Sequence, residues 1–472
     1  MTPKRTAQSG FFSPRFLTGF AFCAIGVLLA LLVFARPNQL VETQNQSVGQ
    51  QSIPTFVGIR SPEPSGVPAV GTIENMEGDG LIDLAALDIH PTSVPVFLHG
   101  SSKAPIPGGA AMSTGKAFLG MTHEVVNQNT TAAFGTLSSG WSPMESVQFY
   151  INGVLAATFA ANADGVFAVG ISTGAGFGYV TIDQKGLTSG KETGGVVQVA
   201  PTGPYLPGVT GAPHAINTAA SGHFYLYGWG YPPSSSTTVT LYRNGIFQGF
   251  VATNASGRFF ATFTAANNGD TSAVYSADTG TTGSMAGVSL EERADAGTPP
   301  VGDQNAARVF LDRATLDSAV GGTVSLVGEG FQAGETVTIS RCAAVSLPAT
   351  ADGAFKAFLA YAPGAGISQC VLTGGTSGRV ARGTVLLHAN VTNVRGLIGA
   401  PAFVPAGGTV PILATKLPPS DTGNIYLDGV STPTPTPTPT CPTAQIYTYT
   451  PTPGPYLAGT TNAPIPIPGQ DL

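Results

Sequence analysis

The six residues FYINGV at 149–154 recur, with small changes, as LYRNGI at 241–246 and as IYLDGV at 425–430. In each copy apolar residues alternate with others up to an Asn-Gly or Asp-Gly pair, which is the period of a strand with one buried face. Asn, Asp and Gly tolerate the positive φ angles that a two-residue hairpin turn needs. The sequence therefore predicts a β-hairpin at each of these three positions.

The hairpins keep a fixed register with other motifs. A turn of the form ADGVF follows at a constant spacing, centred on Gly165 and Gly257, and recurs as ADGAF at Gly353. The segments GWSPMESV, GYPPSSSTTV and GFQAGETV stand before the corresponding strands. A unit of about 90–100 residues with a turn every 8–12 residues is typical of a two-sheet Greek-key sandwich. We therefore predict an all-β chain of tandem Greek-key β-sandwich modules.

The modules resemble bacterial immunoglobulin-like repeats, which occur in tandem in exported surface and adhesion proteins. The resemblance rests on the Gly-x-Gly-aromatic turns at 228–231 and 328–331, the Asn-Gly hairpins and the Asp-Gly-x-Phe turns, over roughly residues 111–429. The first module departs from the pattern with SSGW at 138–141. The resemblance implies an immunoglobulin-like fold and a role in adhesion, spacing, carbohydrate binding or assistance to an enzyme.

The flanks of the repeats differ in composition from the modules. A spacer rich in Gln, Pro, Ser and Gly precedes them, and we expect it to be partly disordered. A Pro/Thr tract, STPTPTPTPTCPT, follows them and favours an extended stalk or linker. The predicted organisation is a signal peptide or signal anchor at 1–35, the spacer at 36–110, immunoglobulin-like modules at 111–200, 201–297 and 298–393, a partial module at 394–430 and a Pro/Thr-rich tail at 431–472.

The N-terminus carries an export signal. Lys4, Arg5 and Arg15 precede an apolar run at 16–35, the arrangement of a basic region followed by a hydrophobic region. The run is also about long enough to span a bilayer as an apolar helix, so cleavage and retention as an anchor both remain open. Either outcome places the rest of the chain in the cell envelope or outside the cell. A membrane contact is expected only through this segment, if it is uncleaved.

Charge and motifs argue against several classes of function. Only 10% of residues are charged, the net charge is −6, and no Lys/Arg cluster follows the N-terminal segment, so no nucleic-acid partner is expected. GISTG at 170–174 and GEGFQA at 328–333 match the nucleophile-elbow and dinucleotide patterns, but both motifs require a strand followed by a helix. We expect no catalysis, no cofactor and no metal site.

Four residues are candidate structural or binding positions. Cys342 and Cys370 lie in one module and are predicted to form a disulfide, because Cys342 takes the place of the hairpin asparagines and Cys370 lies in a strand-like run. Cys441 is then an unpaired thiol in the tail. Trp229 and Tyr231 form a Gly-backed aromatic cluster that either fills the module core or, if exposed, contacts a sugar ring.

The stretch at 75–88 has a partial likeness to a calcium loop. Asn75, Glu77 and Asp79 match its first ligand positions, but Ala86 stands where a bidentate carboxylate belongs. Calcium binding and a solvated acidic turn both remain open for this stretch.

These observations predict an exported cell-surface or extracellular structural or adhesion protein, shaped as a rod of modules, whose partners are other surface proteins or glycans. The alternative is a carbohydrate-binding accessory protein of a secreted hydrolase system. The partial module lacks the strands that would complete its sandwich. It either packs on the third module, helped by QIYTY at 445–449, or accepts a strand from another chain, which would allow self-association.

Overall fold

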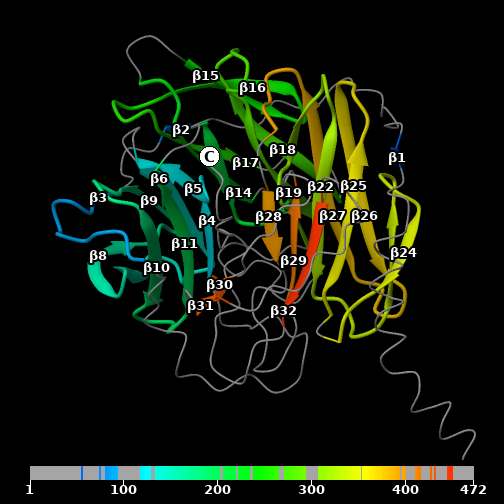
Figure 1. The fold of residues 1–472 in the computed structure, drawn as a ribbon, viewed down its shortest axis with the longest axis horizontal. Helices are drawn as coiled ribbons and strands as arrows, with labels where there is room; N and C mark the ends of the chain where they lie inside the picture. The colour runs from blue at the N-terminus through cyan, green and yellow to red at the C-terminus, as the bar shows by residue number, and fades with distance from the viewer. Residues whose placement is uncertain are drawn as a thin grey trace, which may run out of the picture. The chain divides into compact units, whose positions relative to one another are not determined.

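The structure is a computed structural model in which every described element is a β-strand or a turn (Figure 1). Among these residues no helix is long and apolar enough to cross a membrane. The predicted signal segment at 1–35 and most of the Pro/Thr tail lie outside the described residues. Those are 55–56, 74–75, 80–93, 117–128, 133–201, 206–218, 222–233, 238–264, 270–293, 307–351, 353–393, 396–399, 410–415, 426–427, 430–431 and 444–449.

Module 1 is a sandwich of two sheets. Strand β5 pairs in parallel with β11, whereas β4 pairs with β6 in the other sheet, so the first strand is shared between the sheets as in immunoglobulin-like domains. The strand orders are β3-β9-β6-β4 and β5-β11-β10-β7-β8. The strands are β3 (Gly80–Asp83), β4 (Phe118–Met121), β5 (Val125–Asn127), β6 (Ala133–Ser139), β7 (Ser146–Ile151), β8 (Val154–Ala160), β9 (Phe167–Ser172), β10 (Gly178–Gly186) and β11 (Glu192–Ala200).

Module 2 repeats this topology, with the orders β12-β14-β17-β2 and β13-β19-β18-β15-β16. The chain is therefore built of tandem immunoglobulin-like Greek-key sandwiches, as the repeats predict. Its strands are β2 (Glu74–Asn75), β12 (Gly208–Ala212), β13 (Ala215–Asn217), β14 (His223–Trp229), β15 (Thr238–Arg243), β16 (Ile246–Ala252), β17 (Phe259–Thr264), β18 (Thr271–Asp278) and β19 (Ala286–Arg293).

Module 3 has the same arrangement, in the orders β1-β25-β22-β20 and β21-β27-β26-β23-β24. Each of its two main sheets keeps the pairing of the corresponding sheet in modules 1 and 2. Its strands are β1 (Thr55–Phe56), β20 (Arg308–Leu311), β21 (Thr315–Asp317), β22 (Gly322–Glu329), β23 (Thr336–Ser340), β24 (Val345–Pro348), β25 (Phe355–Tyr361), β26 (Gly366–Gly374) and β27 (Val380–His388).

The repeated hairpin turns have the conformation that their sequence requires. Asn152 has φ 48° and Asn244 has φ 53°, and each is followed by a glycine with positive φ. The side-chain oxygen of each asparagine also accepts a hydrogen bond from the next strand, from Thr181 N at 2.8 Å and from Val274 N at 2.8 Å. The asparagine therefore forms the turn and ties it to the neighbouring strand.

A second turn is shared by all three modules. The backbone N–H of a buried aromatic residue donates to the carbonyl of the glycine in the Gly-x-Phe turn, at 3.3 Å in module 1, 3.0 Å in module 2 and 3.2 Å in module 3. Module 1 uses Trp141 here, so SSGW keeps the geometry despite its different letters. The pairs are Trp141 with Gly165, Tyr231 with Gly257 and Phe331 with Gly353.

Module 3 contains the predicted disulfide between Cys342 and Cys370, whose Cα atoms are 4.8 Å apart. Cys342 takes the place of the hairpin asparagines and Cys370 lies in β26, the counterpart of the strand that those asparagines contact. The disulfide of module 3 therefore takes the place of the hydrogen bonds by which the hairpin asparagines contact the neighbouring strand in modules 1 and 2.

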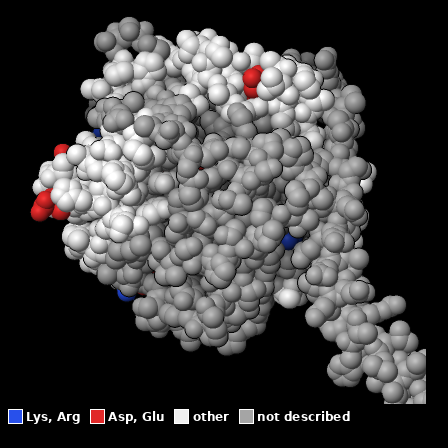
Figure 2. Space-filling model, in the orientation of Figure 1, with Lys and Arg blue, Asp and Glu red and all other residues white. Residues whose placement is uncertain are grey.

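Neighbouring modules contact each other through residues of their sheets. Leu137 and Ala168 of module 1 share a buried cluster with Tyr227 and Trp229 of module 2. Between modules 2 and 3, the hydroxyl oxygens of Ser272 and Thr384 are 2.7 Å apart. Both faces of several sheets are thus buried, which accounts for the scarcity of charged residues; Figure 2 shows few of them on the described surface.

The flanking segments are joined to the modules. β3, from the region expected to be a spacer, pairs with β9, and β2 and β1 pair with β17 and β25. Gly80–Asp83 is thus a strand where a calcium loop would need a turn. In the partial module, β29 pairs with β28. It also pairs with β32, which contains the QIYTY stretch at 445–449. The partial module's elements are β28 (Gly396–Gly399), β29 (Val410–Thr415), β30 (Tyr426–Leu427), β31 (Val430–Ser431) and β32 (Ala444–Tyr449).

Thr415 of β29 is fixed to module 3. Its hydroxyl donates to the carboxylate of Asp312 and accepts a hydrogen bond from Arg313, and its side chain is buried. The partial module is therefore docked on module 3 within the same chain in this structure.

Candidate functional site

The outer strand of module 2 exposes a pair of aromatic side chains. Phe247 and Phe250 of β16 are 53% and 60% exposed, and their ring centroids are 4.9 Å apart. In the described chain β16 pairs only with β15 and so forms an edge of its sheet. The pair is thus an apolar contact surface beside an open strand edge.

A β-bulge places both rings on one face. Leu241 lies opposite Gly249 but Tyr242 lies opposite Phe247, so Gln248 is an extra residue in β16. Side chains alternate along a strand, and residues three apart would normally point to opposite faces. The extra residue restores a common face, which is a typical use of bulges near functional sites.

Only module 2 carries the aromatic pair. Strand β8 of module 1 has a bulge at the same point, but Leu155 and Thr158 occupy the positions of the two phenylalanines. Strand β24 of module 3 is shorter and pairs without a register shift. The pair is therefore a property of one module and not a requirement of the fold.

The chemistry of β16 suits an apolar protein surface. Its sequence, IFQGFVA, has no charged residue, and charged side chains are a common device that protects edge strands from pairing. The ring planes of Phe247 and Phe250 are inclined by 59°, so they do not form the flat platform on which a sugar ring stacks. Residues that could transfer protons or coordinate a metal are absent from the strand.

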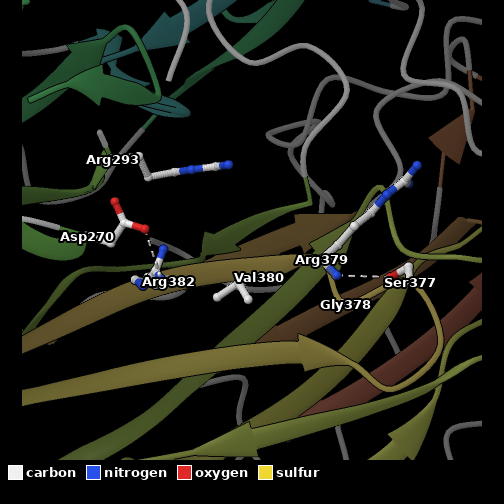
Figure 3. A pocket seen from close by; sticks show the side chains of 7 residues that line it. All are labelled: Asp270, Arg293, Ser377, Gly378, Arg379, Val380 and Arg382. Carbon is white, nitrogen blue, oxygen red and sulfur yellow. Dashed lines mark hydrogen bonds and ion pairs between the residues drawn. The ribbon is translucent and has the colours of Figure 1, made fainter. Parts of the chain in front are cut away.

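A second candidate is a polar pocket of about 270 Å³ between modules 2 and 3 (Figure 3). Asp270 and Arg293 come from module 2. Arg379 and Arg382 come from the turn and the first residues of β27, and Figure 3 shows the guanidinium of Arg382 beside the Asp270 carboxylate while Arg379 points away.

The charges of this pocket are largely paired. Arg382 lies 3.0 Å from Glu291 and 3.6 Å from Asp270, and Arg379 donates to the carbonyl of Gly330. Burial raises the pKa of Glu291 to about 7, although the charges of Arg293 and Arg382 oppose the shift. Arg382 therefore forms ion pairs between modules 2 and 3. The positive charge of the arginines also favours binding of an anionic group.

His214 is a half-buried titratable group at the same junction. Its ring lies 4.9 Å from that of Phe310 in module 3, and its Nε2 is buried without a hydrogen-bond partner. Burial, with the nearby charges of Arg308 and Arg293, lowers the pKa of His214 to about 3. The imidazole is thus neutral over the physiological range and serves as packing.

The aromatic residues proposed from the sequence are buried. Trp229 is 4% exposed and Tyr231 is 3% exposed, so neither is available to a sugar in this structure. Tyr231 belongs to the module 2 core, whereas Trp229 lies between modules 1 and 2 under the guanidinium of Arg258, 5.3 Å away. A Cβ added to Gly170 of module 1 would come within 2.5 Å of Trp229.

The stretch that matches the nucleophile-elbow pattern, GISTG at 170–174, lies at the end of a β-strand. Ser172 ends β9 and pairs with Ala133 and Asp83, with no helix after it. No group of three or more His, Cys, Asp or Glu side chains in the described part of the chain could hold a metal. Sequence reasoning missed Phe247 and Phe250; the available signal was two aromatics after an Asn-Gly turn, where the copy in module 1 has Leu155 and Thr158.

No protein-family model and no curated protein sequence matches the chain. Solved structures that are similar to parts of it include the D0–D1 domains of intimin, with 13% identity over 37% of this chain and 97% of that one at a TM-score of 0.19. Fibronectin(III)-like modules of Clostridium thermocellum CbhA match at 13% identity over 38% and 95%, with a TM-score of 0.15. A 1.5-MDa bacterial ice-binding adhesin matches at 15% identity over 58% and 98%, with a TM-score of 0.15. At these values the matches carry no evidence about function.

Proposed function

We propose that the chain is an exported, non-catalytic structural or adhesion protein of the cell surface that holds a partner surface protein through the β16 aromatic pair. The observation that carries this proposal is the exposed Phe247–Phe250 pair on an uncharged edge strand. The N-terminal basic and apolar segment supports export.

The aromatic pair has the properties of a protein-binding hot spot. Aromatic side chains contribute strongly to interfaces because they bury much area and lose little side-chain freedom. Each phenylalanine is about half exposed, and burying the rest of both rings contributes about 2–3 kcal/mol. In the described chain no strand pairs with the outer side of β16, and this edge adds a means of fixing orientation, since an extended segment can pair with an open edge.

The packing of the modules supports a structural role. Modules 2 and 3 are joined by the Ser272–Thr384 contact, by Arg382 with Glu291, and by a hydrogen bond from Asn390 to Asp278 at 2.7 Å. Such polar, buried contacts oppose motion of the two modules relative to each other. The aromatic pair is then presented on a stiff support, which lowers the entropy that binding must overcome.

The alternative function, a carbohydrate-binding accessory protein of a secreted hydrolase system, requires a flat aromatic platform or another sugar site. The inclined rings of β16 and the buried Trp229 and Tyr231 do not supply that platform. Among the described residues, the pocket of Figure 3 is a candidate place for an acidic sugar.

Binding of the fluorescently labelled protein to native cells that lack its gene tests the proposal. Phe247→Ala/Phe250→Ala should weaken binding by about 30- to 150-fold, the equivalent of the 2–3 kcal/mol above. Phe177→Ala is the matched control, because Phe177 is 68% exposed in module 1 and should leave binding unchanged. Equal binding by the double variant would overturn the proposal, and loss of binding on adding soluble polysaccharide would favour the alternative.

A further inference from the structure

A segment that precedes module 1 in the chain completes its fold. β3 pairs in parallel with β9, from Gly80 opposite Val169 to Asp83 opposite Ser172, and Leu84 N then donates to Ser172 O at 3.0 Å. Without β3, β9 would be the edge of its sheet. The segment therefore fills a strand position that the module itself leaves open.

The segment is anchored in the core as well as on the edge. Ile82, Leu84 and Ile89 are 4%, 0% and 5% exposed and belong to the main cluster of module 1. Beyond them, Thr92 and Tyr179 exchange two backbone hydrogen bonds of 2.9 and 2.8 Å. Residues 80–92 thus run from the edge of one sheet to a strand of the other.

The surface that receives the segment is shaped for it. A Cβ added to Gly178, which has φ +139°, would lie 2.4 Å from the carbonyl oxygen of Thr92. A Cβ on Gly174 would come within 3.1 Å of Ala85, and one on Gly80 would come within 2.2 Å of the Phe159 ring. Glycines on both partners allow this close approach.

The connection does not determine which copy of module 1 receives the strand. A parallel pair has no hairpin between its strands, and residues 94–116 separate the segment from the first strand of the module. A chain of this length spans up to about 75 Å when extended. The same region supplies β2 and β1 to the equivalent edges of modules 2 and 3, each through two residue pairs.

We propose that residues 80–92 are an exchangeable strand, and that module 1 accepts this segment from a second copy of the chain. A tethered segment has an effective concentration of the order of millimolar, so each copy keeps its own strand in dilute solution. As the protein concentration approaches that value, exchange links copies without any new type of contact, as in domain swapping. The same contacts then join two chains.

Cysteine cross-linking in the full-length chain tests this proposal, in a background with Cys23→Ser and Cys441→Ser. Asp83 and Ser172 are register partners on the solvent face, so Asp83→Cys and Ser172→Cys are placed in separate chains, mixed, concentrated to about 1 mM and oxidised. We expect a dimer whose peptide map shows an 83–172 disulfide. One chain carrying both substitutions should form the bond internally at micromolar concentration.

Two controls make the result decisive. Asp83→Cys mixed with Met144→Cys measures random collisions, since Met144 is 68% exposed and is not a register partner of β3. Exchange predicts at least tenfold more 83–172 dimer than 83–144 dimer. If the mixed chains give no excess at 1 mM while the double variant closes internally, the strand stays within its own chain and the proposal is overturned.

Discussion

Removing the positive charge of Arg243 should destabilise module 2 far more than removing the whole ion pair to which it belongs. Arg243 Nε donates to Glu292 at 2.8 Å, Nη2 donates at 2.5 Å, and Tyr275 adds a hydroxyl donor to the same carboxylate at 2.7 Å. Burial alone would lower the pKa of Arg243, but the hydrogen bonds and charge of Glu292 raise it above the ordinary value. Arg243 is therefore charged, and the ion pair that it forms with Glu292 is buried.

The magnitude follows from this arrangement. Arg243→Met leaves the Glu292 carboxylate buried with a single hydroxyl donor, and such a loss costs about 3–5 kcal/mol. Arg243→Met/Glu292→Met removes both charges and fills the space, so the remaining cost is about 1 kcal/mol for the hydroxyl of Tyr275. Since 1.4 kcal/mol is a factor of ten, amide exchange in β19 should accelerate about 150- to 4000-fold in the single variant and under tenfold in the double.

Hydrogen exchange with mass spectrometry on peptides of β18 and β19 measures this difference directly. Peptides of module 1 in the same samples serve as the control for a change in global conditions. Equal acceleration in the single and double variants would refute the reasoning, because it would mean that the contacts of the pair, and not an uncompensated charge, determine the stability.

Three further outcomes are expected. Cys342→Ser/Cys370→Ser should lower the stability of module 3 by about 3–4 kcal/mol, since the bond closes a separation of 28 residues, and peptide mapping without reductant should recover the native pair. Stability should fall by up to about 1.4 kcal/mol per unit as pH drops below 6.5, because unfolded His214 takes up a proton that the native state accepts only near pH 3; His214→Gln should flatten this slope in urea unfolding. Gly257→Ala should cost several kcal/mol, because its Cβ would lie 2.0 Å from a backbone oxygen, whereas Gly190→Ala, with open space around it, should cost about 1 kcal/mol in thermal unfolding.

The sequence predicted the parts of the fold that depend on local chemistry. The Asn-Gly turns require positive φ, and the alternation before them defines one buried face, so the hairpins of Asn152 and Asn244 are readable without any tertiary information. The Cys342–Cys370 pair followed from the same register, because Cys342 stands where the other modules have asparagine. Such signals depend on neighbouring residues in the sequence and not on tertiary contacts.

Features that depend on long-range contacts were not readable. β3 lies in a segment with a spacer composition, and its parallel pairing with β9 leaves no turn signal between the strands. Trp229 could not be assigned to a junction, because stacking of the modules depends on Gly135 and Gly170 of module 1 making room for aromatics of module 2. The aromatic pair of β16 required knowledge of the bulge at Gln248.

Treatment of intact native cells with protease, combined with fractionation of the culture, tests whether the protein is exported to the cell surface. We expect the protein to occur in the envelope or the medium, and we expect added protease to degrade the surface-exposed fraction while a cytoplasmic marker survives. Recovery of the protein only from the cytosol, protected until lysis, would contradict export and, with it, the proposed role at the cell surface.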